Sequence, residues 1–310
     1  MNGECSLCPR HCCVRRKEER GFCGADNALE VSSVCVHRGE EPPLNPIVNV
    51  FFTHCNLQCI YCQNWQISGK CGSLKVKGER YSVDTLADAI TSHLWLHKVA
   101  DHSSPLTSNI IGFVTAAHYA DQLPAIVEAV RQRGYEPTVV YNSGGYESVE
   151  TLRSLEGLVD VYLPDLKYMD SSLAARYSHA ADYPEVAAAA LMEMKRQVGG
   201  GLITGDDGIA CRGMIVRQLV LPGATDNSLQ CLEWLADHFN PFTLHLSLMA
   251  QYFPPRTGLP APLDRTLTDD EYAAVTARAE ELGFTEGWVQ ELEARNNYRP
   301  DFDKKDNPFE

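Results

Sequence analysis

Short apolar runs alternate with longer amphipathic stretches through most of the chain, which is the pattern of strands that are each followed by a helix. The predicted strands are 47–52, 110–115, 138–141, 159–163, 214–221 and 243–248. The predicted helices are 83–98, 121–133, 148–155, one or two within 171–198, then 228–239 and 268–282. This repeated order predicts an α/β fold with a parallel sheet and right-handed crossovers.

Two closures of such a sheet are compatible with the pattern, a partial barrel and an open doubly wound sheet. No Gly-x-Gly-x-x-Gly follows any predicted strand, so a dinucleotide-binding fold is disfavoured. We predict a partial (β/α)6 TIM-like barrel over residues 46–298. In either closure the residues just after the strands line the active face. These residues are 53–62, 115–118, 142–146, 165–167, 222–223 and 248–252.

The two ends of the chain lack this alternation. Residues 1–45 are rich in cysteine and arginine and have neither helical nor strand periodicity, so they predict a small metal-stapled segment. The stretch from Pro42 to Pro46 would separate it from the main body. Residues 299–310 are polar and are expected to form a tail or a strap over the barrel.

Composition and charge narrow the possible surroundings of the protein. The 310 residues contain 27 Lys plus Arg and 41 Asp plus Glu, for a net charge of −14, which disfavours a nucleic-acid partner. No apolar run reaches the length of a membrane span, and no membrane partner is expected. The first residues lack the features of a signal peptide, which predicts a cytoplasmic protein.

The twelve cysteines are unevenly distributed. Clustered cysteines in a reducing cytosol more often bind metals or do chemistry than form disulfides. Five lie within residues 1–23 and three within residues 55–62, and the other four are scattered. Two of the scattered four, Cys211 and Cys231, are expected to be small buried apolar residues.

The central cluster has the spacing C-x3-C-x2-C, formed by Cys55, Cys59 and Cys62 just after the first predicted strand. Three thiolates at these intervals can ligate three irons of a [4Fe–4S] cubane and leave the fourth iron open. An open iron beside a strand end is a place for cofactor or substrate chemistry. The alternative is a zinc site that takes Cys71 or His54 as its fourth ligand.

With an aromatic residue, Tyr61, before the last cysteine, this motif resembles the signature of the radical S-adenosylmethionine (SAM) superfamily. Within it, the chain is most similar to proteins related to pyruvate formate-lyase activating enzyme. Further motifs support this resemblance over most of residues 5–300, and they are Cys62-Gln63-Asn64, Val114-Thr115, residues 142–146, Asp165-Leu166-Lys167, residues 217–223 and residues 249–252.

The resemblance implies that SAM chelates the open iron. An electron from the reduced cluster would cleave SAM to methionine and a 5′-deoxyadenosyl radical, which abstracts hydrogen from the substrate. It also implies an electron donor such as flavodoxin or ferredoxin. The substrate is either a glycyl radical enzyme partner or a peptide or small molecule that is modified directly. Tyr61 would pack near the adenine.

The same resemblance suggests roles for polar residues at the strand ends. Lys167 and Arg217 could hold the SAM carboxylate by charge-assisted hydrogen bonds, and a charge at the end of an apolar strand is costly unless paired. Asp165 would pair with Lys167 or bind the ribose. The remaining candidates for cofactor contacts are Asn142, Ser143, Ser247 and Gln251.

The end of the second predicted strand departs from the relatives. Their Gly-Gly-Glu motif, which receives the SAM amino group, is replaced here by Thr115-Ala116-Ala117-His118. Thr115 and His118 are the candidate substitutes. His118 could equally be an acid or base in catalysis, or a core residue.

Near the N-terminus, Cys5, Cys8, Cys12 and Cys23 supply four thiolates, which suit either a tetrahedral zinc or an auxiliary [4Fe–4S] cluster. The sequence does not choose between them, and a metal-free segment is also possible. Cys13 and His11 are further potential metal ligands that a four-coordinate site would not need. The basic residues nearby are expected to be solvated, and they are Arg10, Arg15, Arg16 and Lys17.

Three function classes follow from these observations. The first is a radical SAM enzyme. The second is a non-enzymatic iron–sulfur electron-transfer protein, which would have closed four-cysteine sites and no SAM cleavage. The third is a colourless interaction protein stabilised by zinc.

Overall fold

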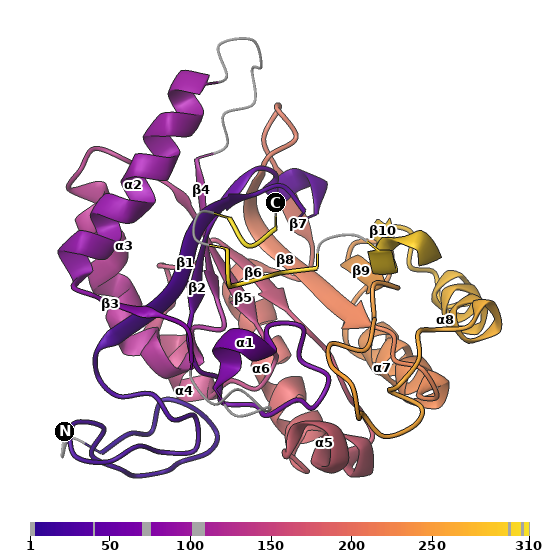
Figure 1. Cartoon of the computed structure of the whole chain (residues 1–310). Helices are drawn as coiled ribbons and strands as arrows, with labels where there is room; N and C mark the ends of the chain where they lie inside the picture. The colour runs from indigo at the N-terminus through magenta and orange to yellow at the C-terminus, as the bar shows by residue number, and fades with distance from the viewer. Residues whose placement is uncertain are drawn as a thin grey trace.

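The computed structural model describes residues 4–39, 41–69, 76–100, 109–296, 299–304 and 307–309. Its strands form one ten-stranded sheet in the order β10-β9-β8-β6-β5-β4-β2-β1-β3, with β7 paired to β8 (Figure 1). The strands are β1 (Leu29–His37), β2 (Ile47–Phe52), β3 (Glu79–Tyr81), β4 (Ile110–Val114), β5 (Thr138–Ser143), β6 (Val161–Pro164), β7 (Leu202–Thr204), β8 (Ala210–Leu219), β9 (His245–Met249) and β10 (Gly287–Val289).

All six predicted strands are present, as β2, β4, β5, β6, β8 and β9, and they pair in parallel. Every residue of β2, β4 and β6 is buried, which explains their continuous apolar sequences. The predicted α/β class with a mainly parallel sheet is therefore confirmed. Among the described strands, β3 and β10 end the order without pairing to each other.

The N-terminal segment contains a strand that the sequence pattern did not predict. β1 pairs antiparallel with β2, with Val34 opposite Val50 and His37 opposite Ile47. Its burial alternates only in part, because the pairing has an irregularity between Val31 and Ser33. Residues 1–45 are thus not a wholly separate segment, since 29–37 extend the main sheet. The short edge strands β3, β7 and β10 were also not predicted.

The helices flank the sheet near the predicted positions (Figure 1). The range 121–133 begins as a 3-10 turn, because Pro124 favours the first turn of a helix that starts only at Leu123. The helical elements are η1 (Pro42–Leu44), α1 (Trp65–Ser68), α2 (Val83–Ala100), η2 (Ala117–Gln122), α3 (Leu123–Arg131), α4 (Val149–Ser154), α5 (Ser171–Ser178), α6 (Tyr183–Val198), α7 (Thr225–His238), α8 (Asp269–Glu281) and η3 (Leu292–Asn296).

The described residues near the C-terminus, 299–304 and 307–309, lie against the sheet (Figure 1). Phe302 is 7% exposed, and its ring lies 5.5 Å from that of Phe51. Phe309 packs at the same distance from Phe51, on β2.

Of the helices that the structure describes, none is both long and apolar enough to cross a membrane.

Candidate functional site

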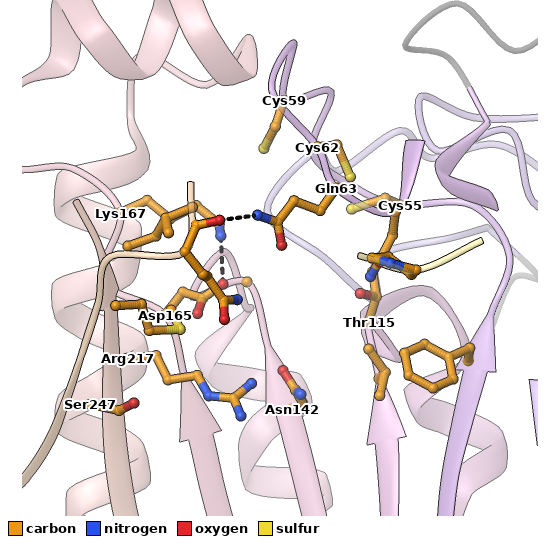
Figure 2. A pocket seen from close by; sticks show the side chains of 18 of the residues that line it. Cys55, Cys59, Cys62, Gln63, Thr115, Asn142, Asp165, Lys167, Arg217 and Ser247 are labelled. Carbon is orange, nitrogen blue, oxygen red and sulfur yellow. Dashed lines mark hydrogen bonds and ion pairs between the residues drawn. The ribbon is translucent and has the colours of Figure 1, made fainter. Parts of the chain in front are cut away.

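The predicted cysteine motif occupies the loop between β2 and α1, and its three sulfur atoms face one opening (Figure 2). His54 starts this loop with a φ of 69°, and its backbone N–H donates to the Ile67 carbonyl at 2.7 Å. This bond ties the start of the loop to its end. The N–H of Leu57 donates to Cys55 Sγ at 3.3 Å, as expected for a backbone that supports a thiolate.

The C-terminal end of α5 supports the middle cysteine. Ser178 Oγ donates to Cys59 Sγ at 3.0 Å and lies 2.7 Å from the hydroxyl of Tyr168. The Tyr168 hydroxyl in turn donates to that of Tyr61 at 2.7 Å. Tyr61 is only 4% exposed and lines the main cavity. Its ring is therefore held in place as a wall of the site.

A cavity of about 410 Å³ opens in front of the three cysteines. This volume lies within the usual range for small-molecule and cofactor sites. Its described lining contains no cysteine other than Cys55, Cys59 and Cys62. Most of the polar residues predicted at the strand ends line it as well, and these are Thr115, Asn142, Asp165, Lys167, Arg217, Ser247 and Gln251.

An ion pair faces the cysteines across this cavity (Figure 2). Lys167 Nζ lies 2.5 Å from Asp165 Oδ2. Burial lowers the pKa of Lys167, but Asp165, and after it Cys59, raise it by more, so the net pKa is well above its usual range and the ammonium stays charged. The Lys167 backbone is fixed by its N–H to Tyr183 OH at 3.0 Å and by Asn227 Nδ2 to its carbonyl at 2.9 Å.

The second predicted cation already has a partner within the protein. Arg217 Nε and Nη2 donate to the two carboxylate oxygens of Glu41 at 2.8 Å and 2.6 Å. Burial raises the pKa of Glu41 to about 7, and the Ser247 hydroxyl opposes that rise. The sequence did not single out Glu41, because it lies in the irregular stretch before β2. The Arg217–Glu41 ion pair therefore forms part of the cavity wall without any ligand being bound.

A second buried carboxylate was also missed. Glu147 lines the cavity and is 4% exposed. Ser143 Oγ donates to its Oε1 at 2.7 Å, and Tyr141 OH donates to its Oε2 at 3.1 Å. Ser143 is not among the lining residues, so the structure gives it the role of orienting Glu147, unlike its neighbour Asn142, which reaches the cavity. In the sequence, the hydroxyl residue Ser143 just after a predicted strand, four residues before Glu147, was the pattern that could have indicated this contact.

Replacing Glu147 by glutamine should change how stability depends on pH. Burial raises the pKa of Glu147 from 4.5 to about 7, although the hydroxyls of Ser143 and Tyr141 oppose the rise. The native state then binds the proton more tightly than the unfolded chain. The carboxyl's contribution is therefore complete below pH 4.5 and is lost as the pH rises through 7.

We expect the wild type to lose about 2–3 kcal/mol of unfolding free energy, relative to Glu147→Gln, between pH 4.5 and 8. Urea unfolding of both proteins across this range measures the difference. A difference that stays constant with pH would contradict the assignment of the titration to Glu147.

The Thr115–His118 stretch divides between two places. Thr115 lines the cavity with a φ of 57°, and its N–H donates to the Asn142 carbonyl at 3.0 Å. His118 is not among the described lining residues of this cavity. It is 1% exposed, its Nε2 lies 2.7 Å from the Thr53 carbonyl, and burial lowers its pKa to about 3. His118 is thus a neutral buried residue behind the loop. This position fits the core residue that the sequence left open, and it does not fit a cofactor contact in the main cavity.

Thr115→Gly should stabilise the protein while altering the cavity. A β-branched residue with positive φ is strained, whereas glycine adopts this conformation freely. Relief of that strain stabilises the folded state, while the greater conformational entropy of glycine stabilises the unfolded chain. The net result should be an unfolding free energy higher by about 1 kcal/mol. Urea unfolding would measure it, with Thr243→Gly, outside the cavity, as the comparison. A loss of stability at Thr115 would show that its side-chain contacts outweigh the strain.

Gln251 links the cysteine loop to the far side of the sheet. Its backbone carbonyl accepts from Gln63 Nε2 at 3.2 Å, the contact drawn in Figure 2. Its side-chain oxygen accepts from Gln290 Nε2 at 3.1 Å. Both Gln63 and Gln290 line the cavity, although neither was predicted as a cofactor contact.

The four N-terminal cysteines line a second, small cavity. Among the described residues, no three His, Cys, Asp or Glu side chains already stand close enough together to hold one metal ion, and this includes both cysteine groups. Cys13 is exposed. Two of the basic residues are not solvated as expected, because Arg16 is 6% exposed and Arg10 donates to the Asn56 carbonyl at 2.9 Å.

The remaining cysteines and the alternative ligands complete the comparison. His54 Nε2 lies 3.4 Å from Glu30 Oε2. Cys71 lies outside the described residues. Cys231 is fully buried, as predicted, but the prediction for Cys211 is wrong, because it lies exposed near the start of β8.

Comparison with protein-family models finds no match. The chain is 29% identical over 284 residues to an uncharacterized protein of Methanocaldococcus jannaschii, which covers 89% of this chain and 74% of that protein. A second uncharacterized protein of the same organism is 35% identical over 80 residues, which is 21% of this chain and 24% of that protein.

Several solved structures are similar at a greater distance. Native anSMEcpe with bound AdoMet has a TM-score of 0.44 and 11% identity over 73% of this chain and 56% of its own. HydG, a maturase of the [FeFe]-hydrogenase, has a TM-score of 0.44 and 13% identity over 78% and 51%. The cobalamin-dependent SAM radical enzyme OxsB has a TM-score of 0.38 and 13% identity over 64% and 27%. This chain matches about half of their length or less, and the likeness is too distant to assign a function.

Proposed function

We propose that this protein is a radical SAM enzyme, in which Cys55, Cys59 and Cys62 hold a [4Fe–4S] cluster and SAM fills the adjoining cavity. The observation that carries this proposal is a single short loop whose three thiols face a cavity of about 410 Å³ with no fourth cysteine in its described lining. When bound, the cluster supplies the electron that cleaves SAM to methionine and a hydrogen-abstracting 5′-deoxyadenosyl radical.

The donor set and the cavity both fit these groups. Three thiolates leave one iron of a cubane without a protein ligand, whereas an electron carrier would close the site with a fourth. The loop lies at the C-terminal edge of the parallel strands, where α/β folds bind their ligands. In this proposal the sheet is the wall of a partial barrel, and residues 46–298 form the catalytic body.

The polar residues suit a zwitterionic cofactor. Lys167 carries a fixed positive charge toward the cysteines and would hold the SAM carboxylate. Asp165 and Glu147 supply acidic groups on the same wall, where the amino group needs a partner. Asn142 and Gln251 would donate to the ribose or carboxylate. Tyr61, held by Tyr168, would pack against the adenine.

Thr115 stands where the resembling activating enzymes carry their Gly-Gly-Glu motif. Its φ of 57° is a conformation that glycine adopts without strain. Thr115 therefore holds a conformation that favours glycine, and in this proposal the acidic groups come from other strand ends. This supports SAM binding by a changed set of side chains.

The finer parts of the proposal concern partners. The electron would come from a donor such as flavodoxin or ferredoxin in the cytoplasm. The hydrogen would come either from a glycyl radical enzyme, following the resemblance to activating enzymes, or from a peptide or small molecule modified directly.

Anaerobic reconstitution with iron and sulfide, followed by reduction with SAM, tests the proposal. We expect 5′-deoxyadenosine from the wild type and from Cys211→Ala, whose exposed thiol lies outside the cavity. Cys59→Ala should produce none. A wild type that binds iron and sulfide yet leaves SAM intact would instead favour an electron-transfer protein, and a colourless protein would favour the zinc-stabilised class.

A further inference from the structure

A second cavity lies inside the N-terminal segment, and four cysteines surround it. Its volume is about 10 Å³, and it is lined by Cys5, Leu7, Cys8, Cys12, Val14, Arg16, Gly21, Cys23 and His118. This space is comparable to that of one water molecule. It suits a single ion, whereas an eight-atom cubane would require the segment to expand.

The backbone around this cavity holds the thiols toward it. The N–H of Cys5 donates to the Val14 carbonyl at 2.9 Å, and the N–H of Cys13 donates to the Cys5 carbonyl at 3.1 Å. These bonds close the segment into a loop around the cavity. The N–H of Phe22 donates to Cys12 Sγ at 3.2 Å, which is a contact that stabilises a thiolate.

Strain in the same loop indicates that something beyond its own packing holds it. His11 and Cys13, on either side of Cys12, have φ values of 40° and 53°. Such conformations are unfavourable for residues other than glycine and persist where the surroundings impose them. A segment this short has little core of its own to impose them. His118 also lines this cavity, and its Nδ1 is buried without a hydrogen-bond partner.

We propose that Cys5, Cys8, Cys12 and Cys23 bind one zinc-class ion in a closed tetrahedral site. Four thiolates are a complete ligand set for structural zinc and leave no position for substrate. No three of these sulfurs stand at ligand spacing in this structure, so binding requires them to move into a tetrahedral arrangement around the ion. The ion takes no part in electron transfer.

The site braces the loop that carries the catalytic cysteines. Arg10, between Cys8 and Cys12, donates through Nε to the Asn56 carbonyl at 2.9 Å and through Nη1 to the His179 carbonyl at 2.7 Å. Its guanidinium also lies 3.8 Å from the centre of the Phe22 ring. Asn56 follows Cys55 directly, so the position of Arg10 fixes that of the first catalytic cysteine.

A second connection enters from the other side of the loop. Arg16 Nη1 donates to the His118 carbonyl at 2.5 Å, and the His118 ring contacts the Thr53 carbonyl at 2.7 Å. Thr53 lies directly after β2 and directly before His54, where the loop begins. The N-terminal site therefore holds the loop at both Thr53 and Asn56, on either side of Cys55.

Metal analysis of a variant that lacks the central cluster tests the ligand assignment. The variant is Cys55→Ala/Cys59→Ala/Cys62→Ala, expressed in cells supplied with both zinc and iron. We expect it to contain about one zinc per chain and no acid-labile sulfide. Adding Cys8→Ser should remove the zinc, and adding Cys211→Ser should not. About four irons with sulfide would overturn the proposal, as would the absence of any metal. Because no SAM chemistry enters, this result is independent of the proposed activity.

Hydrogen exchange in the wild-type chain tests the brace. Removal of zinc by a chelator should speed amide exchange of residues 53–62 by about tenfold or more. Arg10→Ala keeps all four thiols, so it should retain the zinc and still loosen the same residues. Unchanged exchange in the loop after zinc removal, or in Arg10→Ala, would overturn the bracing role even where zinc is bound.

Discussion

At a pH above the raised pKa of Glu41, Arg217→Met is expected to destabilise the protein by about 3–5 kcal/mol, because it leaves the buried Glu41 carboxylate without its cation. The side chains of Arg217 and Glu41 are 14% and 6% exposed, and they meet through two hydrogen bonds. Water has little access to replace the lost partner. Urea unfolding, followed by circular dichroism, measures the change.

The matched control is the double variant Glu41→Met/Arg217→Met. Removing both charges avoids the cost of a lone buried carboxylate, so it should recover most of the lost stability. Arg278→Met is a further comparison, because its contacts with Glu233 and Glu281 are at the surface and should contribute about 1 kcal/mol or less. If the double variant is as unstable as Arg217→Met, the loss comes from packing and not from the unpaired charge.

Lys167→Met is expected to slow SAM cleavage by about 10- to 100-fold, chiefly through weaker SAM binding. Its ammonium faces the cysteines, lies 2.5 Å from Asp165, and stays charged because Asp165 and Cys59 hold its pKa high despite burial. A neutral side chain of similar length keeps the packing but would lose the charge-assisted bond that we propose to the SAM carboxylate. The rate of 5′-deoxyadenosine formation, measured against SAM concentration, gives the effect.

Lys17→Met, at an exposed position, serves as the control and should leave the rate unchanged. The iron content of Lys167→Met should equal that of the wild type, because the three cysteines remain. A normal dependence on SAM concentration in Lys167→Met would exclude Lys167 as the carboxylate partner. A loss of iron would place its role in the cluster loop instead.

In two regions the structure adds what the sequence did not determine. β1 was missed because an irregularity interrupts its alternation, and because a strand on the flank of a sheet gains its stability from pairing with β2. For His118 the sequence left a cofactor contact, an acid or base, and a core residue open, and the structure fits the core residue. The 3-10 turn of η2 carries it behind the loop, where Thr53 occupies its ring nitrogen.

The residues that orient others were also hidden in the sequence. Glu41 and Tyr183 became visible only through partners far away in the chain, whereas Glu147 is held by Ser143 and Tyr141, a few residues before it. Arg10 and Arg16 looked like ordinary surface charges, yet both donate to backbone carbonyls of the main body. Single-residue patterns do not encode such contacts, because they depend on which elements pack together.

The sequence was enough to predict the alternation of strands and helices along the chain and to place Cys55, Cys59 and Cys62 in one loop at a strand end. Local periodicity and short spacing are enough for both, because each depends on neighbouring residues. Only the folded chain shows that Lys167 faces those cysteines and that Arg217 is paired with Glu41. Those outcomes depend on contacts between segments far apart in the chain, whose geometry is set only when the sheet assembles.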